Sequence, residues 1–185
     1  IAPLMDDVEL LYQVLERYNQ YYSELQNSMW LGKLGMESLQ ESDETLVDEL
    51  TSLLQQVETD MTIFFRLLST INRPDITLLK KAFYDQDNIP LKEWNVWLNK
   101  WWKRVDGKPN RNNMNEVNPK YVLRNWMAQL DIYGAEDGDF SICEELYLLL
   151  KQPYAEQPEY EDKWFKKRPE WARHRVGCSM LSCSS

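Results

Sequence analysis

The sequence of 185 residues is poor in the residues from which many active sites are built: it has one His, three Cys and six Gly. A catalytic zinc site usually takes three good protein ligands, and a phosphate-binding loop needs clustered glycines, so these residues supply neither site. No stretch approaches the roughly 18 apolar residues that a membrane-spanning helix requires. With 43% hydrophobic residues, the chain can bury one core without disulfide or metal support, which excludes a disordered or cysteine-stapled protein.

The chain opens with Ile1-Ala2-Pro3 rather than Met, which we interpret as a processed product or a piece of a longer protein. It is rich in aromatic residues, with 8 Trp and 10 Tyr. We expect these to form packing and docking surfaces. If a neighbouring region of a longer protein is missing, one contiguous apolar patch should be exposed, and a homodimer of the isolated chain could cover it.

The net charge of -9 argues against general affinity for nucleic acid, which needs a basic surface. The charge is uneven: residues 1–60 carry a net -11, residues 61–129 a net +6 and residues 130–185 a net -4. This pattern has two interpretations, namely alternating solvated helix faces or a basic strip from Lys80 to Arg111 that meets an acidic partner or a nucleotide. Aromatic residues interleave the strip at a spacing more typical of a buried helix face: Trp94, Trp97, Trp101 and Trp102.

The three cysteines do not form the pattern of a secreted disulfide framework. Cys143 lies in an apolar run and is expected to be a small buried hydrophobic residue. Cys178 and Cys183 lie in a Ser-rich terminal segment, where they indicate an exposed thiol pair in a reducing compartment.

Apolar residues recur at steps of three and four along nearly the whole chain, which predicts an all-α fold. We expect an irregular bundle of about six helices in a subdomain over 1–153 and an extended, wrapping or partly disordered tail over 154–185. The clearest loop runs over 106–115, where Gly, Pro and four Asn gather. The expected helices cover about 7–35, 43–68 with a kink near Thr59, 75–84, 90–105, 119–137 and 139–152.

Two helix starts in the second half carry recognisable caps. Asn118-Pro119 is expected to be an N-cap followed by the first residue of a helix that ends at Gly138. Asp139 is then expected to cap the last helix, whose apolar face would hold Phe140, Cys143, Tyr147 and Leu150.

No complete active site is visible in these residues. The acidic run 131–145 does not fit a calcium-binding loop, because Ile142 and Leu148 would occupy the positions of the required Gly and Glu. His174 lies between two arginines and is expected to be solvated and non-catalytic. We therefore assign no catalytic, cofactor-binding or metal-binding residue to this chain.

The order of several motifs resembles the C-terminal end of the selenoprotein O family, the pseudokinase-fold protein adenylyltransferases. The likeness covers essentially the whole chain and is densest over 118–185. The motifs are Thr62-Ile63-Phe64-Phe65-Arg66-Leu67-Leu68, Asn118-Pro119-Lys120-Tyr121-Val122-Leu123-Arg124-Asn125-Trp126, Gly138-Asp139-Phe140, Pro153-Tyr154, Pro169-Glu170-Trp171-Ala172 and Ser182-Cys183-Ser184-Ser185.

The resemblance implies a parent enzyme that transfers AMP from ATP to Ser, Thr or Tyr of protein substrates, with ATP and magnesium bound by a kinase-like region upstream of this chain. The family's catalytic and cofactor-binding positions would all lie in that region. The chain itself would scaffold the kinase-like region, its main partner, and should not transfer AMP alone. The alternative is a freestanding helical module that binds a protein partner, and an upstream reading frame without kinase-like elements would favour it.

The resemblance also assigns roles to residues near the end of the chain. Cys183 matches a cysteine, or selenocysteine in some members, that is implicated in redox control, and Cys178 is a candidate second thiol. Asn118, Pro119, Arg124 and Asn125 are expected to form a helix cap and a polar face that packs on the missing lobe. The expected location is a bacterial cytoplasm, or a mitochondrion if the source is eukaryotic.

Overall fold

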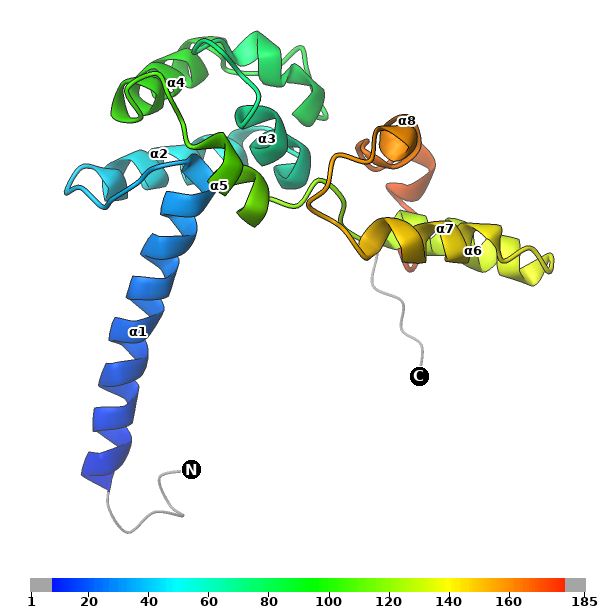
Figure 1. Ribbon diagram of the computed structural model, residues 1–185, viewed down its shortest axis with the longest axis horizontal. Coiled ribbons are helices and arrows are strands. Elements are labelled where there is room, and N and C mark those ends of the chain that lie inside the picture. Colours follow the sequence, from blue (N-terminus) through cyan, green and yellow to red (C-terminus); the bar gives the residue numbers. More distant parts are fainter. Residues whose placement is uncertain (1–7, 179–185) are drawn as a thin grey trace.

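The computed structural model describes residues 8–178 and is all-α, as the sequence predicts (Figure 1). An isolated antiparallel bridge joins Thr59 and Phe83. The helices outnumber the six expected, because one predicted helix is split and further short helices form in the predicted loop and tail. In chain order they are α1 (Val8–Leu34), α2 (Asp43–Gln56), α3 (Met61–Leu68), the 3-10 helix η2 (Ile76–Ala82), α4 (Leu91–Arg104), α5 (Arg111–Val117), α6 (Asn125–Glu136), α7 (Ser141–Leu150), η3 (Pro158–Tyr160), α8 (Glu161–Trp164) and η4 (Glu170–Ala172).

The end of α1 agrees with the prediction. Gly35 follows the helix with φ +65, a left-handed conformation that favours glycine. A Cβ there would lie 2.8 Å from the sulfur of Met114 and 2.9 Å from the backbone nitrogen of Asn110, so the position also admits the close approach of α5. The C-terminal end of α1 is thereby fixed in the body of the protein, and the rest of the helix projects from it (Figure 1).

The predicted helix over 43–68 is two helices rather than one kinked helix. Residues 57–60 separate them, and Asp60 begins α3 by accepting a hydrogen bond from the Ile63 amide at 3.1 Å. The Asp60 amide in turn donates to the carbonyl of Ala82 at 2.8 Å, beside the bridge between Thr59 and Phe83. The break is stabilised by these contacts with a distant segment, which helical periodicity does not reveal.

The region from Asp106 to Asn125 differs most from the prediction. Residues Arg111–Val117 form α5 instead of a loop, because the side chain of Asn110 caps the helix at the Asn113 amide. Residues 118–124 then run without helical structure, and α6 begins at Asn125 instead of at Pro119. The end of α6 before Gly138, which has φ +80, is as predicted.

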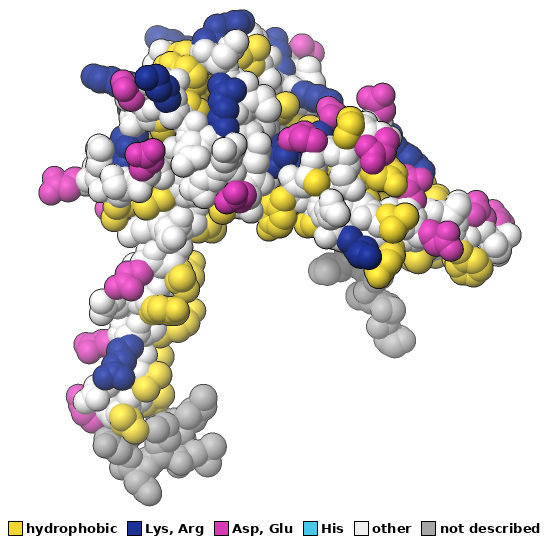
Figure 2. Space-filling model, in the orientation of Figure 1, with side chains coloured by type: hydrophobic (Ala, Val, Ile, Leu, Met, Phe, Trp, Pro, Cys, Tyr) yellow, Lys and Arg dark blue, Asp and Glu magenta, His cyan; other side chains and the backbone are white. Residues whose placement is uncertain are grey.

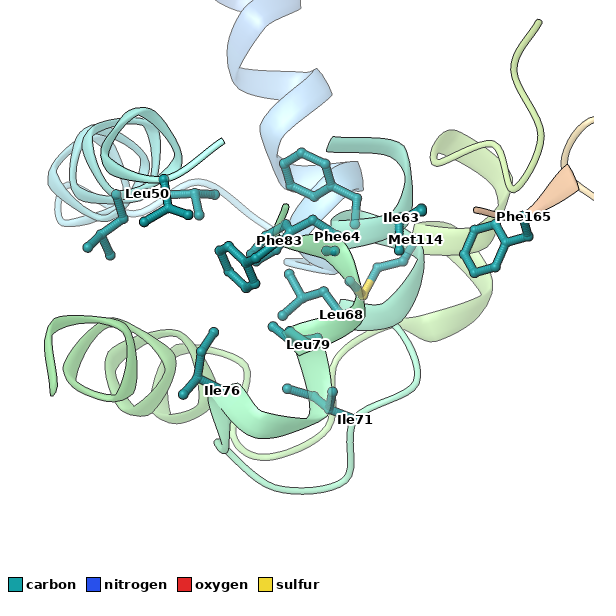
Figure 3. Packing of buried hydrophobic residues seen from close by; sticks show 14 of the residues in the cluster. Leu50, Ile63, Phe64, Leu68, Ile71, Ile76, Leu79, Phe83, Met114 and Phe165 are labelled. Carbon is teal, nitrogen blue, oxygen red and sulfur yellow. The ribbon is translucent and has the colours of Figure 1, made fainter. Parts of the chain in front are cut away.

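An aromatic cluster fills the centre of the body. Trp94, Trp97 and Trp101 of α4 are buried, and the rings of Trp97 and Trp101 are stacked with centroids 6.2 Å apart. Their indole nitrogens donate to backbone carbonyls, Trp97 to Leu46 at 2.8 Å and Trp101 to Leu34 at 2.9 Å. The tryptophans of the basic strip therefore form core, as their spacing indicates, and α3 and η2 add the apolar side chains seen in Figure 3.

Part of the uneven charge is neutralised within the fold. Lys100 of α4 pairs with Glu49 of α2 at 2.6 Å, and Arg104 pairs with the buried Asp43 at 2.7 Å. Burial raises the pKa of Asp43, but hydrogen bonds from Arg104 and the Gln40 amide outweigh burial, and the net pKa lies below the ordinary value. The acidic first third and the basic middle third thus meet between α2 and α4.

The face predicted for the last long helix is wrong. Leu146 and Leu149 of α7 are buried, whereas Phe140 and Tyr147 are exposed. Cys143 is exposed as well, so its predicted burial is incorrect. The helix packs against α6 through the neighbouring stripe, and both apolar stripes fit a helical period equally well.

The segment after Pro153 wraps back onto the body in short helical turns (Figure 1). It buries Trp164, Phe165 and Ala172, and the rings of Trp164 and Trp126 lie 5.7 Å apart. Of the two alternatives for the tail, wrapping describes residues 154–178.

Candidate functional site

The non-helical segment 118–124 joins the first five helices to the rest of the chain, and four of the predicted site residues lie in it or at its end. Asn118 is buried and is bound to the last turn of α1: its side-chain nitrogen donates to the Lys33 carbonyl, and its side-chain oxygen accepts from Lys33 Nζ, both at 3.1 Å. Pro119 follows it, partly buried. Asn118 therefore binds within this chain, and packing of the segment on a missing lobe stays a prediction.

Arg66 of α3 lies beneath this segment with 4% of its side chain exposed. Its guanidinium donates to the carbonyls of Asn115 and Asn118, both at 3.1 Å. It also donates to the carbonyl of Tyr154 at 3.0 Å and to Glu156 Oε1 at 2.5 Å. One arginine thus links α3, α5 and the segment after α7.

The side chain of Lys120 is also 4% exposed, and it too binds the segment that follows α7. Its ammonium donates to Glu156 Oε2 at 2.8 Å and to Glu161 Oε2 at 2.7 Å. Burial lowers the pKa of Lys120, but the hydrogen bonds that its ammonium donates to the two carboxylates outweigh burial, and the net pKa is raised. The backbone amides of Lys120 and Tyr121 both donate to the carbonyl of Pro153, at 2.8 and 3.1 Å.

Arg124 closes the far end of the segment. It forms a two-pronged ion pair with Asp60, in which Nη2 lies 2.8 Å from Oδ1 and Nη1 contacts Oδ2. The Asp60 side chain is 2% exposed and the Arg124 side chain 20%. We call the charged residues Asp60, Arg66, Lys120, Arg124 and Glu156 the polar seam, since they join α3, the segment 118–124 and the segment after α7.

Sequence reasoning placed only Arg124 of the polar seam among the candidate residues. Arg66 carried a usable signal, because it is the single charge in the apolar helix MTIFFRLL, and a buried charge demands partners. Lys120 and Glu156 are 36 residues apart in the sequence, and nothing local relates them.

Asn125 and Cys178 are brought together. The Asn125 side chain donates to the Cys178 carbonyl at 3.1 Å, and the Cys178 sulfur lies 3.9 Å from the Asn125 carbonyl oxygen. Cys178 is buried, which differs from the exposed thiol expected. Cys183 lies outside the described residues, so its pairing with Cys178 stays a prediction.

Glu156 gives the polar seam a dependence on pH. Burial raises the pKa of Glu156, but hydrogen bonds from Lys120 and Arg66 outweigh burial, and the net pKa lies below the ordinary value. A depressed carboxyl pKa contributes stability that is present above the unfolded value, near about 4, and is lost as pH falls through the folded value.

We expect Glu156→Gln to lower the free energy of unfolding by about 0.5–1 kcal/mol at pH 7, a small effect because the Glu156 side chain is 64% exposed. The difference between Glu156→Gln and the parent chain should shrink as pH falls below about 4 and through the lowered pKa of Glu156, because both side chains are then uncharged. Urea denaturation at pH 7 and pH 3 measures this difference in the free energy of unfolding. Glu159→Gln, at an exposed glutamate, is the control. A difference that is the same at both pH values would contradict the role of the charge.

Among residues 8–178, no group of three His, Cys, Asp or Glu side chains is placed to hold a metal ion. No helix within this range is long and apolar enough to cross a membrane. We derive no catalytic step from this chain.

A family model and several known proteins are similar to this chain, and they agree on its family. The family model described as "Protein adenylyltransferase SelO" matches residues 1–151. The chain is 44% identical to a protein nucleotidyltransferase YdiU of Flavobacterium johnsoniae, 41% to that of Aromatoleum aromaticum and 42% to that of Rhodopirellula baltica. Each match covers the whole of this chain but only 37–38% of the relative. The chain therefore belongs to the SelO family of protein adenylyltransferases and spans a little over a third of the length of these relatives.

Proposed function

We propose that this chain is the helical C-terminal part of a protein adenylyltransferase, and that the longer protein transfers AMP from ATP to Ser, Thr or Tyr of protein substrates. In this reaction a protein hydroxyl attacks the α-phosphorus, an O–P bond forms, and pyrophosphate leaves. ATP and magnesium would bind a kinase-like region upstream, which belongs to the rest of the longer protein. The observation that carries the proposal is the family match over residues 1–151, together with relatives named protein nucleotidyltransferases.

The role of this chain within the enzyme would be structural and regulatory. The polar seam fixes the start of the wrapped segment 154–178 against α3 and the segment 118–124. Cys178 is held beside α6 by Asn125, and Cys183 follows five residues later. We propose that Cys183 controls the activity by forming a disulfide, with Cys178 or with a cysteine elsewhere in the longer protein. The relatives named above are bacterial, which supports the cytoplasm of a bacterium as the location.

The test is AMP transfer by the longer protein, with and without Cys183→Ser, in oxidising and reducing buffer, using labelled ATP, magnesium and a protein extract. We expect activity of the parent to change severalfold between the two buffers and that of Cys183→Ser to stay the same, because a thiol pair responds to redox poise and a serine does not. Cys143→Ser, at an exposed thiol, is the matched control and should behave as the parent does.

The 185-residue chain alone is the negative control for catalysis, and transfer of AMP by it would overturn our account of where the active site lies. An identical redox response in the parent and in Cys183→Ser would overturn the regulatory role alone. If the longer protein transferred AMP to none of the proteins in the extract, the proposed activity would be overturned.

A further inference from the structure

The exposed part of α1 is a long helix with almost nothing packed on it. Over residues 9–29, Leu11 alone is partly covered and the other side chains are exposed. Most helices in proteins owe their stability to the packing of an apolar face rather than to helix propensity. A projecting helix of this kind needs a surface to cover it.

The exposed face is apolar along its whole length. We call it the α1 stripe, and its residues repeat at steps of three, four and seven. Of the charges of the same stretch, Glu9 and Glu16 lie on the opposite side of the helix, and Arg17 and Glu24 border the apolar face beside Val14 and Tyr21. Figure 2 shows the hydrophobic side chains along the side of α1 that faces toward α6 and α7. The α1 stripe consists of Leu11, Val14, Leu15, Tyr18, Tyr21, Tyr22, Leu25 and Met29.

The width of the α1 stripe favours packing against the surface of a folded domain over pairing with a second helix in a coiled coil. A two-stranded coiled coil uses two positions of every seven, whereas a helix that packs on a domain shows three. Leu11, Tyr18 and Leu25 occupy one position of the repeat, and Leu15, Tyr22 and Met29 a second. Val14 and Tyr21 add the third position, and their side chains are 54% and 64% exposed.

A second apolar surface lies at the other end of the molecule. Phe140, Tyr147 and Leu148 at the start and on the outer side of α7 are exposed, as is Ile132 of α6. Hydrophobic side chains also line the lower side of α6 and α7 in the view of Figure 2. Both projecting parts thus present exposed apolar side chains, and a contiguous apolar patch on a soluble protein is a sign of an interaction surface.

We infer that the α1 stripe is buried, in the longer protein, against the part of that protein that this chain lacks. This rests on the proposed function only in taking the chain as part of a longer transferase. The missing part accounts for more than half the length of the relatives, so it is large enough to supply a folded surface. The α1 stripe contains no charged side chain, so the surface that covers it is apolar.

Site-resolved alkylation of single cysteines in the longer protein tests this. Tyr18→Cys lies at the centre of the α1 stripe, and Gln13→Cys, the matched control, lies on the opposite side of the same helix, where it is exposed. We expect a maleimide to label Tyr18→Cys at least about 10-fold more slowly than Gln13→Cys in the longer protein, because burial protects a group until it opens locally. In the 185-residue chain the two should react at similar rates.

Similar rates of labelling in the longer protein would overturn the inference. In the longer protein, protection of Tyr18→Cys that weakens on dilution would also overturn it, since a second copy would then cover the α1 stripe. Labelling does not depend on AMP transfer, so a longer protein without that activity would contradict the proposed function and leave this result standing.

Discussion

Replacing Arg66 by methionine should lower the free energy of unfolding by about 3 kcal/mol, one of the two largest single effects that we expect in this chain. Methionine keeps most of the apolar contact of the arginine stem but removes the guanidinium. The carbonyls of Asn115, Asn118 and Tyr154 then lose their donor at a place shielded from water. A loss of this size is a large part of the stability of an ordinary domain.

Two further variants separate the role of Arg66 from that of any positive charge. Arg66→Lys should recover only part of the loss, because one ammonium cannot reach acceptors on three segments. Arg73→Met, at an arginine 60% exposed that pairs only with the neighbouring Asp75, should change stability by less than about 0.5 kcal/mol. Urea denaturation followed by Trp fluorescence measures all three. An Arg66→Met variant as stable as Arg73→Met would show that the polar seam contributes little.

The helices could be predicted from the sequence because each one repeats a local signal. Apolar steps of three and four identify α1, α2, α4, α6 and α7, and Gly35 and Gly138 end two of them at positive φ. The Trp residues of α4 were rightly expected to be core, because Trp94, Trp97 and Trp101 fall on one face.

The errors fall where distant contacts decide the structure. Asn118-Pro119 has the local chemistry of a helix start, but Asn118 is bound to Lys33 of α1, and the helix begins seven residues later. The same limit applies to the polar seam, since Arg66 and Glu156 are 90 residues apart. It applies to α7 as well, where periodicity allowed two stripes and only packing against α6 selects the buried one.

The resemblance identified the family, but the role it gave to Arg124 was too general. A polar face of Asn118, Pro119, Arg124 and Asn125 was expected to meet a missing lobe. In the structure Arg124 binds Asp60, Asn118 binds Lys33 and Asn125 binds Cys178. Exposed apolar side chains lie on α1, α6 and α7, and packing of the polar face on a missing lobe stays a prediction.

The ion pair between Arg124 and Asp60 gives the second large effect. Arg124→Met should lower the free energy of unfolding by about 3 kcal/mol, because it leaves the Asp60 carboxylate buried without its partner at the start of α3. Asp60→Asn should cost less, about 1 kcal/mol, since asparagine can still cap the helix and the released Arg124 is partly exposed to water.

The two substitutions together should cost less than the sum of their separate effects, because the double variant leaves neither charge unpaired, and the coupling should exceed about 1 kcal/mol. The pair Arg173–Glu58 is the matched control: both side chains are well exposed, and its coupling should stay below about 0.5 kcal/mol. Urea denaturation of each set of single and double variants gives both couplings. If the coupling of Arg124 with Asp60 were as small as that of the surface pair, Asp60 would not be what holds Arg124, and a role for this arginine in contacting the rest of the longer protein would regain support.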